Sequence, residues 1–467
     1  MIKCISKLVT RPAYDNTVDV YDPEVWARES LAILRENMVM AGLVHRNFEN
    51  QIQEAGDIVN TRLPGQFTAK RKGDNDDVTI QDATATNVAV ALNHHPHTSF
   101  LLRDGQMSRS FKDLTAEFLN PAVLSLSQYV DRVLCVQGYQ FLSNTAGRLG
   151  AMSNSNVKSY ILEARKVAND NKMDDNGRRN LIWTSDSESI ALDVELFTDA
   201  SSSGGTTALE RGVLGNKFGF RNFMCQNQPT IDNVATGTAT GQKHVGAIDG
   251  AVVAGTTVLV VDGFAGYTVP AGVWVTIGTD LTPIQVASST LTVADTTGIT
   301  LVTGLVRDVP DNATITLINP GAVNGAKSAG YAGDITITAM TVAPQVGQGV
   351  SFGTSAIVYG IIAIPSSTTI TLDRPLEASI GSTAAINLLP AGSYNFAFDQ
   401  GSIALITRPL AMPDARTGAL SYVASFGGLS LRVVMSYQGV KQGMLVTVDM
   451  LCGVKKLDDA RGIVLLG

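Results

Sequence analysis

Asn120-Pro-Ala-Val-Leu-Ser-Leu-Ser-Gln-Tyr-Val-Asp-Arg-Val-Leu-Cys-Val-Gln-Gly-Tyr-Gln-Phe-Leu-Ser143 is the stretch that decides the fold of this chain. Its apolar residues recur at spacings of three and four, which predicts one helix with a single buried face. Asn120 suits the N-cap and Pro121 the first helical position, where a missing N–H costs nothing. At 1.5 Å per residue this helix would be roughly 35 Å long. We expect its buried face to consist of Val123, Leu126, Val130, Val133, Leu134, Gln137 and Phe141.

Polar residues inside this segment argue against a membrane span. Asp131 and Arg132 sit in its middle, and Gln128, Gln137 and Gln140 follow the same helix. A bilayer core would not accommodate that many polar groups on one lipid-facing helix. The segment is therefore predicted to be a spine that is packed inside protein, and no other stretch of the chain is long and apolar enough to cross a bilayer.

Charge and cysteine content exclude several classes of protein. The 467 residues carry a net charge of −7, which argues against a protein held on nucleic acid by electrostatics. Cys4, Cys135, Cys225 and Cys452 are scattered and form no CxxC pair, so we expect reduced, small core residues instead of a disulfide framework or a zinc site. The first residues show no signal-peptide pattern. Folding in a reducing cytoplasm is expected.

Two alternating segments before the spine predict strands, at Asp57–Pro64 and Asn87–Leu92. The segment between them, Gly65–Thr86, is long for a loop in a compact domain, and such length usually indicates function or disorder. It carries a basic patch followed by an acidic one. A hairpin arm with these patches could grip a neighbouring copy of the same chain, but a solvated loop would show the same charges. The patches are Lys70-Arg71-Lys72 and then Asp74, Asp76 and Asp77.

The composition changes between residues 229 and 392. This segment is rich in Gly, Thr, Ala and Val, and its ten acidic and four basic residues account for most of the net charge. Short strands separated by Gly, Pro and Asp turns predict β-barrel or sandwich modules. Because mixed composition resumes after Tyr394, the segment is predicted to be one or two β-domains inserted into an α/β domain, with Gly321–Gly333 as a linker between them.

No reaction centre emerges from the sequence. His94-His95-Pro96-His97 is the most metal-like cluster, but no Cys, Asp or Glu follows at ligand spacing, which favours a structural or surface role. Asp74-Asn-Asp-Asp77 lacks the Gly and Glu of a calcium loop. Gly347-Gln-Gly349 has the wrong spacing for a phosphate loop. We therefore expect no enzyme activity, no catalytic residue, no cofactor and no metal.

Taken in order, these elements resemble the major capsid protein of tailed phages, the Hong Kong 97-like fold. Within that fold the chain is most similar to the coat proteins of the Salmonella phage P twenty-two group, which carry a β-rich insertion at the same place. The insertion here is longer and repetitive. The resemblance is carried by Gly56–Pro64, Asn87–Leu92, Phe398–Pro413 with Thr407-Arg-Pro-Leu410, Leu431-Arg-Val433 and Cys452–Leu457.

The resemblance implies an α+β fold with five parts. Residues 1–50 would form an N-terminal arm and helix. Residues 51–93 would form the E-loop hairpin with its flanking strands. Residues 94–150 and 429–467 would form the P-domain with the spine, residues 151–228 and 393–428 the A-domain, and residues 229–392 the inserted β-rich domain or tandem β modules.

The resemblance further implies a structural shell subunit. Many copies would assemble as hexamers and pentamers into an icosahedral head around double-stranded DNA, which they would contact non-specifically. A scaffolding protein and a portal would take part in assembly in the host bacterial cytoplasm, and a decoration protein is a further partner that the resemblance allows. No membrane would be involved. The shell would expand on maturation into the virion. E-loop contacts between subunits would involve Arg62, Gln66, Phe67, Lys70, Arg71, Lys72, Asp74, Asp76 and Asp77.

Three alternatives remain open from the sequence. An encapsulin-like nanocompartment shell would have the same fold, although the repetitive insertion and the coat-like final strands argue against it. A phage or bacterial surface protein with β modules would explain residues 229–392 but not the spine. An enzyme is the least favoured alternative, because no centre was found.

Overall fold

The computed structural model describes most of the chain, and strands make up most of its elements. It divides into two compact units, one comprising Met1–Asn37, His95–Leu126 and Thr407–Leu451 and the other comprising Met38–His94, Ser127–Ile406 and Cys452–Gly467. The described residues are 26–28, 30–31, 34, 38–46, 58–63, 69–74, 77–78, 80–81, 86–104, 118–175, 177–199, 211–231, 245–264, 269, 271–292, 295–317, 321–338, 344–413, 419–426 and 428–467.

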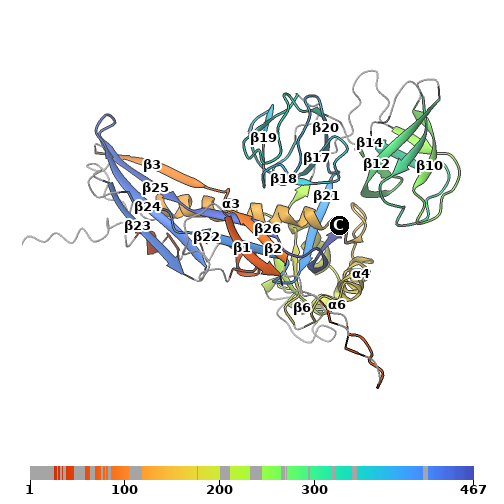
Figure 1. Ribbon diagram of the computed structural model, residues 1–467, viewed down its shortest axis with the longest axis horizontal. Helices are drawn as coiled ribbons and strands as arrows, with labels where there is room; N and C mark the ends of the chain where they lie inside the picture. Colours follow the sequence, from red (N-terminus) through yellow and green to blue (C-terminus); the bar gives the residue numbers. More distant parts are fainter. Residues whose placement is uncertain are drawn as a thin grey trace, which may run out of the picture. The chain divides into compact units, whose positions relative to one another are not determined.

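The first unit contains a four-stranded antiparallel sheet in the order β23-β24-β25-β3. In β24, alternate residues are buried, as expected for a sheet with one covered face. β3 pairs with β25 from His97 opposite Asp449 to Arg103 opposite Gly443, so a strand that precedes the spine joins strands near the end of the sequence (Figure 1). The bounds are β3 His97–Arg103, β23 Ala419–Phe426, β24 Leu429–Gln438 and β25 Gly443–Asp449.

The spine is helix α3, Asn120–Val136, followed by the 3-10 helix η5, Gln137–Phe141. The prediction of one α-helix to residue 143 was therefore wrong for the last turns, where Gly138 weakens the α-helix and packs against Phe396. Phe118 and Leu119 are already helical, so Asn120 is not the N-cap. The residues of the expected face are all buried: Val123, Leu126, Val130, Val133, Leu134, Gln137 and Phe141.

The second unit is built on a mixed sheet in the order β4-β27-β21-β5-β7-β6, with β8 paired to β21. Its helices supply apolar faces, and α4 places Val157, Ile161 and Ala164 in one core with Trp183 and Phe220 of the sheet. The bounds are β4 Thr145–Gly147, α4 Val157–Asp170, β5 Asn180–Trp183, α5 Ser185–Leu192, α6 Glu195–Thr198, β6 Asn216–Lys217, β7 Phe220–Met224, β8 Thr230–Ile231, β21 Gly392–Phe398 and β27 Gly462–Leu466.

Smaller elements complete the α/β part. A hairpin pairs β1 with β2, from Ile58 opposite Ala91 to Leu63 opposite Thr86. A second pair joins β22 to β26. The bounds are η2 Met40–Gly42, β1 Ile58–Leu63, β2 Thr86–Ala91, β22 Ile403–Arg408, β26 Leu451–Lys456 and η7 Asp459–Arg461.

The segment between β8 and β21 folds into two β modules. The first is a closed barrel in the order β10-β13-β12-β11-β14-β9, and the second is a sheet in the order β15-β20-β17-β18-β19-β16 (green and teal in Figure 1). The bounds are β9 Val245–Ile248, β10 Val258–Phe264, β11 Trp274–Ile277, β12 Asp280–Thr292, β13 Asp295–Leu301, β14 Thr314–Leu317, β15 Gly321–Ala322, β16 Ile335–Thr336, β17 Gly349–Phe352, β18 Tyr359–Ser366, β19 Thr369–Leu372 and β20 Ala385–Leu388.

The pairing of β8 with β21 explains how such a large insertion is tolerated. Ile231 lies opposite Gly392 and Thr230 opposite Ser393, so the chain leaves and re-enters the α/β sheet at adjacent positions. The linker predicted at Gly321–Gly333 was wrong. This segment belongs to the second module, because Gly321 pairs with Ile386 and Lys327 forms a bridge with Ile380.

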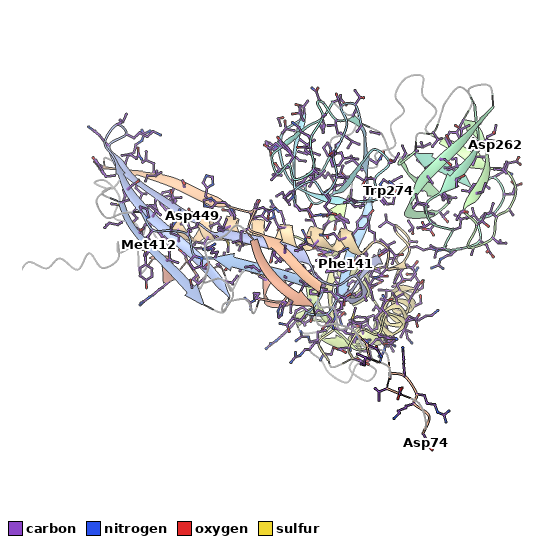
Figure 2. The ribbon with its side chains drawn as sticks, in the orientation of Figure 1. Asp74, Phe141, Asp262, Trp274, Met412 and Asp449 are labelled. Atoms are coloured by element: carbon purple, nitrogen blue, oxygen red, sulfur yellow. The ribbon has the colours of Figure 1, made fainter. Side chains whose placement is uncertain are left out.

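The two modules pack directly against each other. The indole Nε1 of Trp274 donates a hydrogen bond to Ser351 Oγ at 2.7 Å, and Asn387 Nδ2 donates to the carbonyl oxygen of Gly272 at 2.7 Å. A Cβ at Gly272 would lie 1.8 Å from the carbonyl oxygen of Gly353, so no side chain fits there. Trp274, labelled in Figure 2, thus joins the barrel to the second module.

The second module also packs closely against the spine. A Cβ at Gly360, at the second position of β18, would lie 2.2 Å from Cβ of Val136, the last residue of α3. Tyr139 in η5 donates from its hydroxyl to the carbonyl oxygen of Gly347 at 2.6 Å. A glycine is therefore required where β18 meets the end of the spine.

Gly360→Ala is expected to destabilise the protein by about 1–3 kcal/mol, because its methyl group would overpack the contact with Val136. Denaturant unfolding of the purified chain measures the change. Gly381→Ala is the matched control, because a Cβ at Gly381 meets no atom within 4 Å. Equal stabilities for the two variants would contradict the close contact.

Candidate functional site: the exposed hairpin and the polar clamp

The hairpin arm predicted to contact other subunits presents charged side chains to solvent. Lys70, Arg71, Lys72, Asp74 and Asp77 are all exposed, and Figure 2 labels Asp74. Their charges remain accessible to solvent, as a surface that recognises a partner electrostatically requires.

The hairpin also exposes apolar groups. Val78 is 72% exposed and Ile80 is 89% exposed, so the arm combines charge with uncovered aliphatic surface. Arg62 lies in β1 opposite Asn87. The other expected contact residues, Gln66, Phe67 and Asp76, lie outside the described residues.

The histidine cluster is divided among separate partners. His94 is buried and its Nδ1 lies 3.3 Å from the Tyr129 hydroxyl, and burial lowers the pKa of His94. His95 Nε2 lies 3.2 Å from Asp449 Oδ2, while His97 is exposed. Within the described part of the chain, no group of three or more His, Cys, Asp or Glu side chains is arranged to hold a metal ion.

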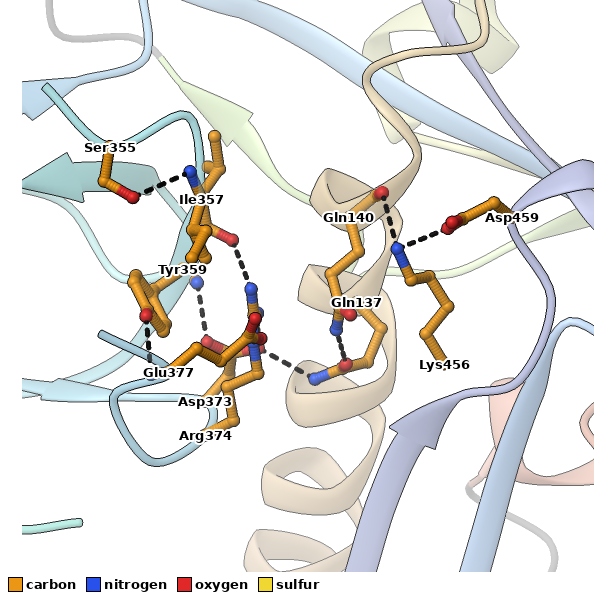
Figure 3. Close-up of polar contacts among 12 residues, drawn as sticks. Gln137, Gln140, Ser355, Ile357, Tyr359, Asp373, Arg374, Glu377, Lys456 and Asp459 are labelled. Atoms are coloured by element: carbon orange, nitrogen blue, oxygen red, sulfur yellow. Dashed lines mark hydrogen bonds and ion pairs between the residues drawn. The ribbon is translucent and has the colours of Figure 1, made fainter. Parts of the chain in front are cut away.

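A largely buried polar network, here called the clamp, joins the spine to the second β module (Figure 3). It consists of Gln137, Tyr359, Asp373, Arg374 and Glu377. Gln137 Nε2 donates to Asp373 Oδ2 at 2.8 Å, and the other carboxylate oxygen, Oδ1, accepts from the backbone N–H of Gly360 at 2.8 Å. Asp373 is fully buried, and its carboxylate thus ties η5 and β18 to the end of β19.

The charge on Asp373 is balanced by the next residue. Arg374 Nη1 lies 2.9 Å from Asp373 Oδ2, and Arg374 Nε lies 2.8 Å from Glu377 Oε1. The guanidinium also donates to the carbonyl oxygen of Val358 and lies 4.5 Å from the centre of the Tyr359 ring. Burial opposes its charge, but Asp373 and Glu377 outweigh that effect and raise the pKa of Arg374.

A cavity of about 880 Å³ adjoins the clamp. Trp274 from the barrel and Ile357 from the second module contribute to its apolar wall, and Ala91 of the hairpin strand β2 also lines it. Its polar lining comes from Gln137, Gln140, Arg374, Glu377 and Lys456. Three clamp residues, Gln137, Arg374 and Glu377, therefore line a cavity that is also lined by the hairpin strand β2 and by both β modules.

A second buried carboxylate lies on the spine. Asp131 Oδ2 accepts a hydrogen bond from the backbone N–H of Val39 at 3.0 Å. Burial raises the pKa of Asp131 to about 6, against the opposing effect of hydrogen bonds from the backbone of Val39, Ala41 and Met40. Asp131, which holds the segment before η2 on the helix, therefore takes up a proton at a higher pH in the folded protein than in the unfolded chain.

The sequence contained one signal for the clamp. Gln137 falls on the apolar face of the predicted spine, and a buried amide requires hydrogen-bond partners. Its partner Asp373 lies 236 residues away, and the sequence pattern of residues 229–392 indicates only short strands and turns there. Asp131 was likewise noticed only as a mid-helix charge.

Asp373→Ala is expected to destabilise the protein by about 3–5 kcal/mol, because it leaves the Arg374 guanidinium buried without its carboxylate. Chemical unfolding followed by tryptophan fluorescence measures the loss. Glu377→Ala is the matched control, because the Glu377 side chain is 51% exposed and its removal should cost less than about 1 kcal/mol. A small loss in Asp373→Ala would show that the clamp does not hold the module to the spine.

Asp131→Asn is expected to change how stability depends on pH. Because the pKa of Asp131 is raised from 3.8 to about 6, its contribution is fully present below pH 4 and is lost as the pH rises through 6. The loss is on the order of 3 kcal/mol, and the variant should lack it. Unfolding free energies from pH 4 to pH 8 test this, with Asp77→Asn in the exposed hairpin as the control. Parallel profiles for the wild-type protein and Asp131→Asn would contradict the assignment.

Comparisons with known proteins give likenesses of fold. No family model matches the sequence, and no curated protein matches it. No helix within the described residues is long and apolar enough to cross a membrane. The chain is similar to a solved structure of Mycobacterium phage Che8, with a TM-score of 0.44, 10% identity and coverage of 91% of this chain and 90% of that chain. It is also similar to a capsid structure of the cyanophage P-SCSP1u (TM-score 0.43, 8% identity, coverage 89% and 85%) and to the mature capsid of bacteriophage PhiM1 (TM-score 0.40, 8% identity, coverage 90% and 86%).

Proposed function

We propose that the chain is a major capsid protein of a tailed double-stranded DNA phage, with the Hong Kong 97-like fold and a β-rich insertion like that of the P twenty-two coat group. Many copies form hexamers and pentamers and build the icosahedral head, which assembles in the host bacterial cytoplasm. A scaffolding protein and a portal take part in assembly, and the head encloses the genome.

The observation that carries this proposal is the order in which the chain builds its parts. A hairpin, β1–β2, precedes a spine helix, and the strand β3 before that helix pairs with β25 near the end of the sequence. Between them lies a mixed α/β sheet that is interrupted once, at β8 and β21. In this proposal the sheet containing β3 and β25 and the spine form the P-domain, and the α/β sheet forms the A-domain.

The exposed hairpin supports self-assembly. Its described residues present both signs of charge and two exposed aliphatic side chains, Val78 and Ile80. A patch of this kind on an extended arm fits a heterologous contact, in which one surface of a subunit meets a different surface of its neighbour and a ring closes. The arm is accordingly proposed as the E-loop.

The clamp supports a structural role for the insertion. A module that was attached only through its two connecting segments would need no buried hydrogen bond to the spine. Here Gln137 of the spine binds Asp373 of the second module, and Gly360 permits β18 to contact Val136. The insertion is therefore proposed to move with the spine as part of the shell wall, where it stabilises the subunit and offers a surface to a decoration protein.

The charge balance fits a shell that encloses DNA without gripping it. A net charge of −7 gives little counterion-release affinity for a duplex. DNA that a motor packages into a closed shell does not need such affinity to remain inside. The subunit contacts, repeated over many copies, provide the stability of the particle.

The proposal is tested by expressing the full chain with and without a co-expressed scaffolding protein and imaging the products by electron microscopy. Closed shells of uniform size with hexameric and pentameric units are expected. Monodisperse monomers under every condition, or fibres, would overturn the proposal.

Replacement of Lys70, Arg71 and Lys72 by Glu is expected to prevent shell assembly while the monomer stays folded, because the arm would lose its basic patch and would be repelled by neighbouring subunits of net charge −7. Sedimentation velocity measures assembly and circular dichroism measures folding. The matched control changes three exposed lysines in or near α4, Lys158, Lys166 and Lys172, to Glu and alters the net charge equally. Normal shells from the hairpin variant would show that these charges are only a solvated surface.

A further inference from the structure

Two cysteines that lie far apart in the sequence are in contact inside the second unit. The Sγ atoms of Cys135 and Cys225 are 3.8 Å apart, and 90 residues separate them along the chain. Both thiols are free and buried. The sequence predicted isolated, reduced core cysteines. That expectation missed the contact, because spacing along a chain does not reveal which elements meet.

A carboxylate completes the cluster. Asp131 Oδ2 lies 4.0 Å from Cys225 Sγ, within reach of its S–H. Asp131 is one helical turn before Cys135 on the same spine, so both project toward the segment that follows β7. The three side chains form a buried row in the order Asp131, Cys225, Cys135. None of these three residues belongs to the clamp or to the hairpin.

We infer that Cys135 and Cys225 are an oxidisable pair, which closes a disulfide between the spine and the α/β sheet when a peroxide reaches it, with Asp131 as the proton acceptor. The chemistry depends on the row itself and stands whether or not the chain forms a shell. If the chain is a capsid protein, release of particles from a reducing cell would expose the pair to oxidants.

The geometry requires a modest movement. A disulfide brings its sulfur atoms to about 2.05 Å, so the present separation has to shrink by less than 2 Å. Cys135 is the next-to-last residue of α3, just before the 3-10 turns of η5, and Cys225 directly follows β7. Both residues therefore lie near the ends of regular elements, where a side-chain rotation and a small backbone shift disturb few hydrogen bonds.

The arrangement also assigns the order of the two steps. Burial raises the pKa of the Cys135 thiol well above its ordinary value, and Cys225 and Asp131 raise it further. Cys225 has the carboxylate beside it and is the sulfur that attacks first.

The reaction balances with one peroxide molecule. Asp131 takes the proton from Cys225, whose sulfur attacks one oxygen of hydrogen peroxide, and the O–O bond breaks. The leaving hydroxide takes the proton back and becomes water, which leaves a sulfenic acid on Cys225. The Cys135 sulfur then attacks that sulfur, the S–O bond breaks, and the departing hydroxide leaves as water with the Cys135 proton. Two thiols are oxidised to one disulfide, and the peroxide is reduced to two water molecules.

The experiment treats the purified full chain with a small excess of hydrogen peroxide, blocks remaining thiols with iodoacetamide under denaturing conditions, and maps disulfides by mass spectrometry without reduction. A peptide pair joined through Cys135 and Cys225 is expected, and reduction should separate it. The disulfide closes a long loop, so the thermal midpoint should rise by on the order of 5–10 °C and return when a reductant is added.

Variants distinguish disulfide formation between Cys135 and Cys225 from oxidation of other cysteines. Cys452 is also fully buried, and Cys452→Ser should still form the linked peptides and show the rise in midpoint. Cys225→Ser should form no linked peptide and show no rise. Asp131→Asn should reach the same disulfide more slowly, because the proton acceptor is gone. Should any substitution prevent folding, the peptide map of the wild-type protein decides the question alone.

Two results would overturn the oxidisable pair, and a third would overturn the role of Asp131. Cys135 and Cys225 could both be recovered fully alkylated after prolonged exposure to peroxide. The linked peptides could join Cys225 to a cysteine other than Cys135 or to a second chain. An equal oxidation rate in Asp131→Asn and the wild-type protein would remove Asp131 from the mechanism while leaving the pair itself in place.

Discussion

Close packing around the end of the spine is the constraint on which the rest of this structure depends. The centres of the Phe141 ring and the Phe396 ring of β21 lie 5.2 Å apart. A Cβ at Gly462 of β27 would lie 2.3 Å from Cδ1 of Phe141. On another side Gly360 of β18 approaches Val136 just as closely. Three separate parts of the chain thus converge on six residues, 136–141. Close-packed interiors transmit such contacts, so a displacement at this point would be felt in each of the three parts.

The insertion shows how a large segment joins an existing fold at little cost. Because β8 and β21 are paired, the α/β sheet keeps its hydrogen bonds across the point of insertion. The barrel has its own apolar core, which includes Leu259, Val275 and Ile315. The second module differs, because its Asp373 is fully buried against the Gln137 amide of the spine and is paired with the largely buried Arg374. A buried ion pair contributes little net stability compared with apolar packing, but it fixes one geometry, because any other placement leaves charges unpaired.

For much of the candidate site, the sequence indicated which residues would be buried or exposed, but not which residues they would contact. The hairpin charges were visible as a run of residues, and exposure follows from their character. Gln137 on an apolar face indicated a buried hydrogen bond, and Asp131 in the middle of the spine indicated a buried charge. Neither pattern named Asp373 or the backbone of Val39, because helical periodicity reports which face is buried and is silent about what covers it. The linker expected at Gly321–Gly333 failed for a related reason. Glycine and alanine also serve as strand residues when a neighbouring strand supplies the hydrogen bonds.

Short-range sequence patterns were enough to predict several elements of the fold. The spine, the strands on either side of the hairpin loop, and the change to β structure near residue 229 all follow from spacing and composition over short windows. The tertiary structure alone decided which distant residues meet. It placed Cys135 against Cys225 and Gln137 against Asp373, and it converted the last turns of the spine to a 3-10 helix. The physical reason is that these contacts depend on three-dimensional packing between residues that lie 90 and 236 positions apart in the sequence, beyond the reach of any local pattern.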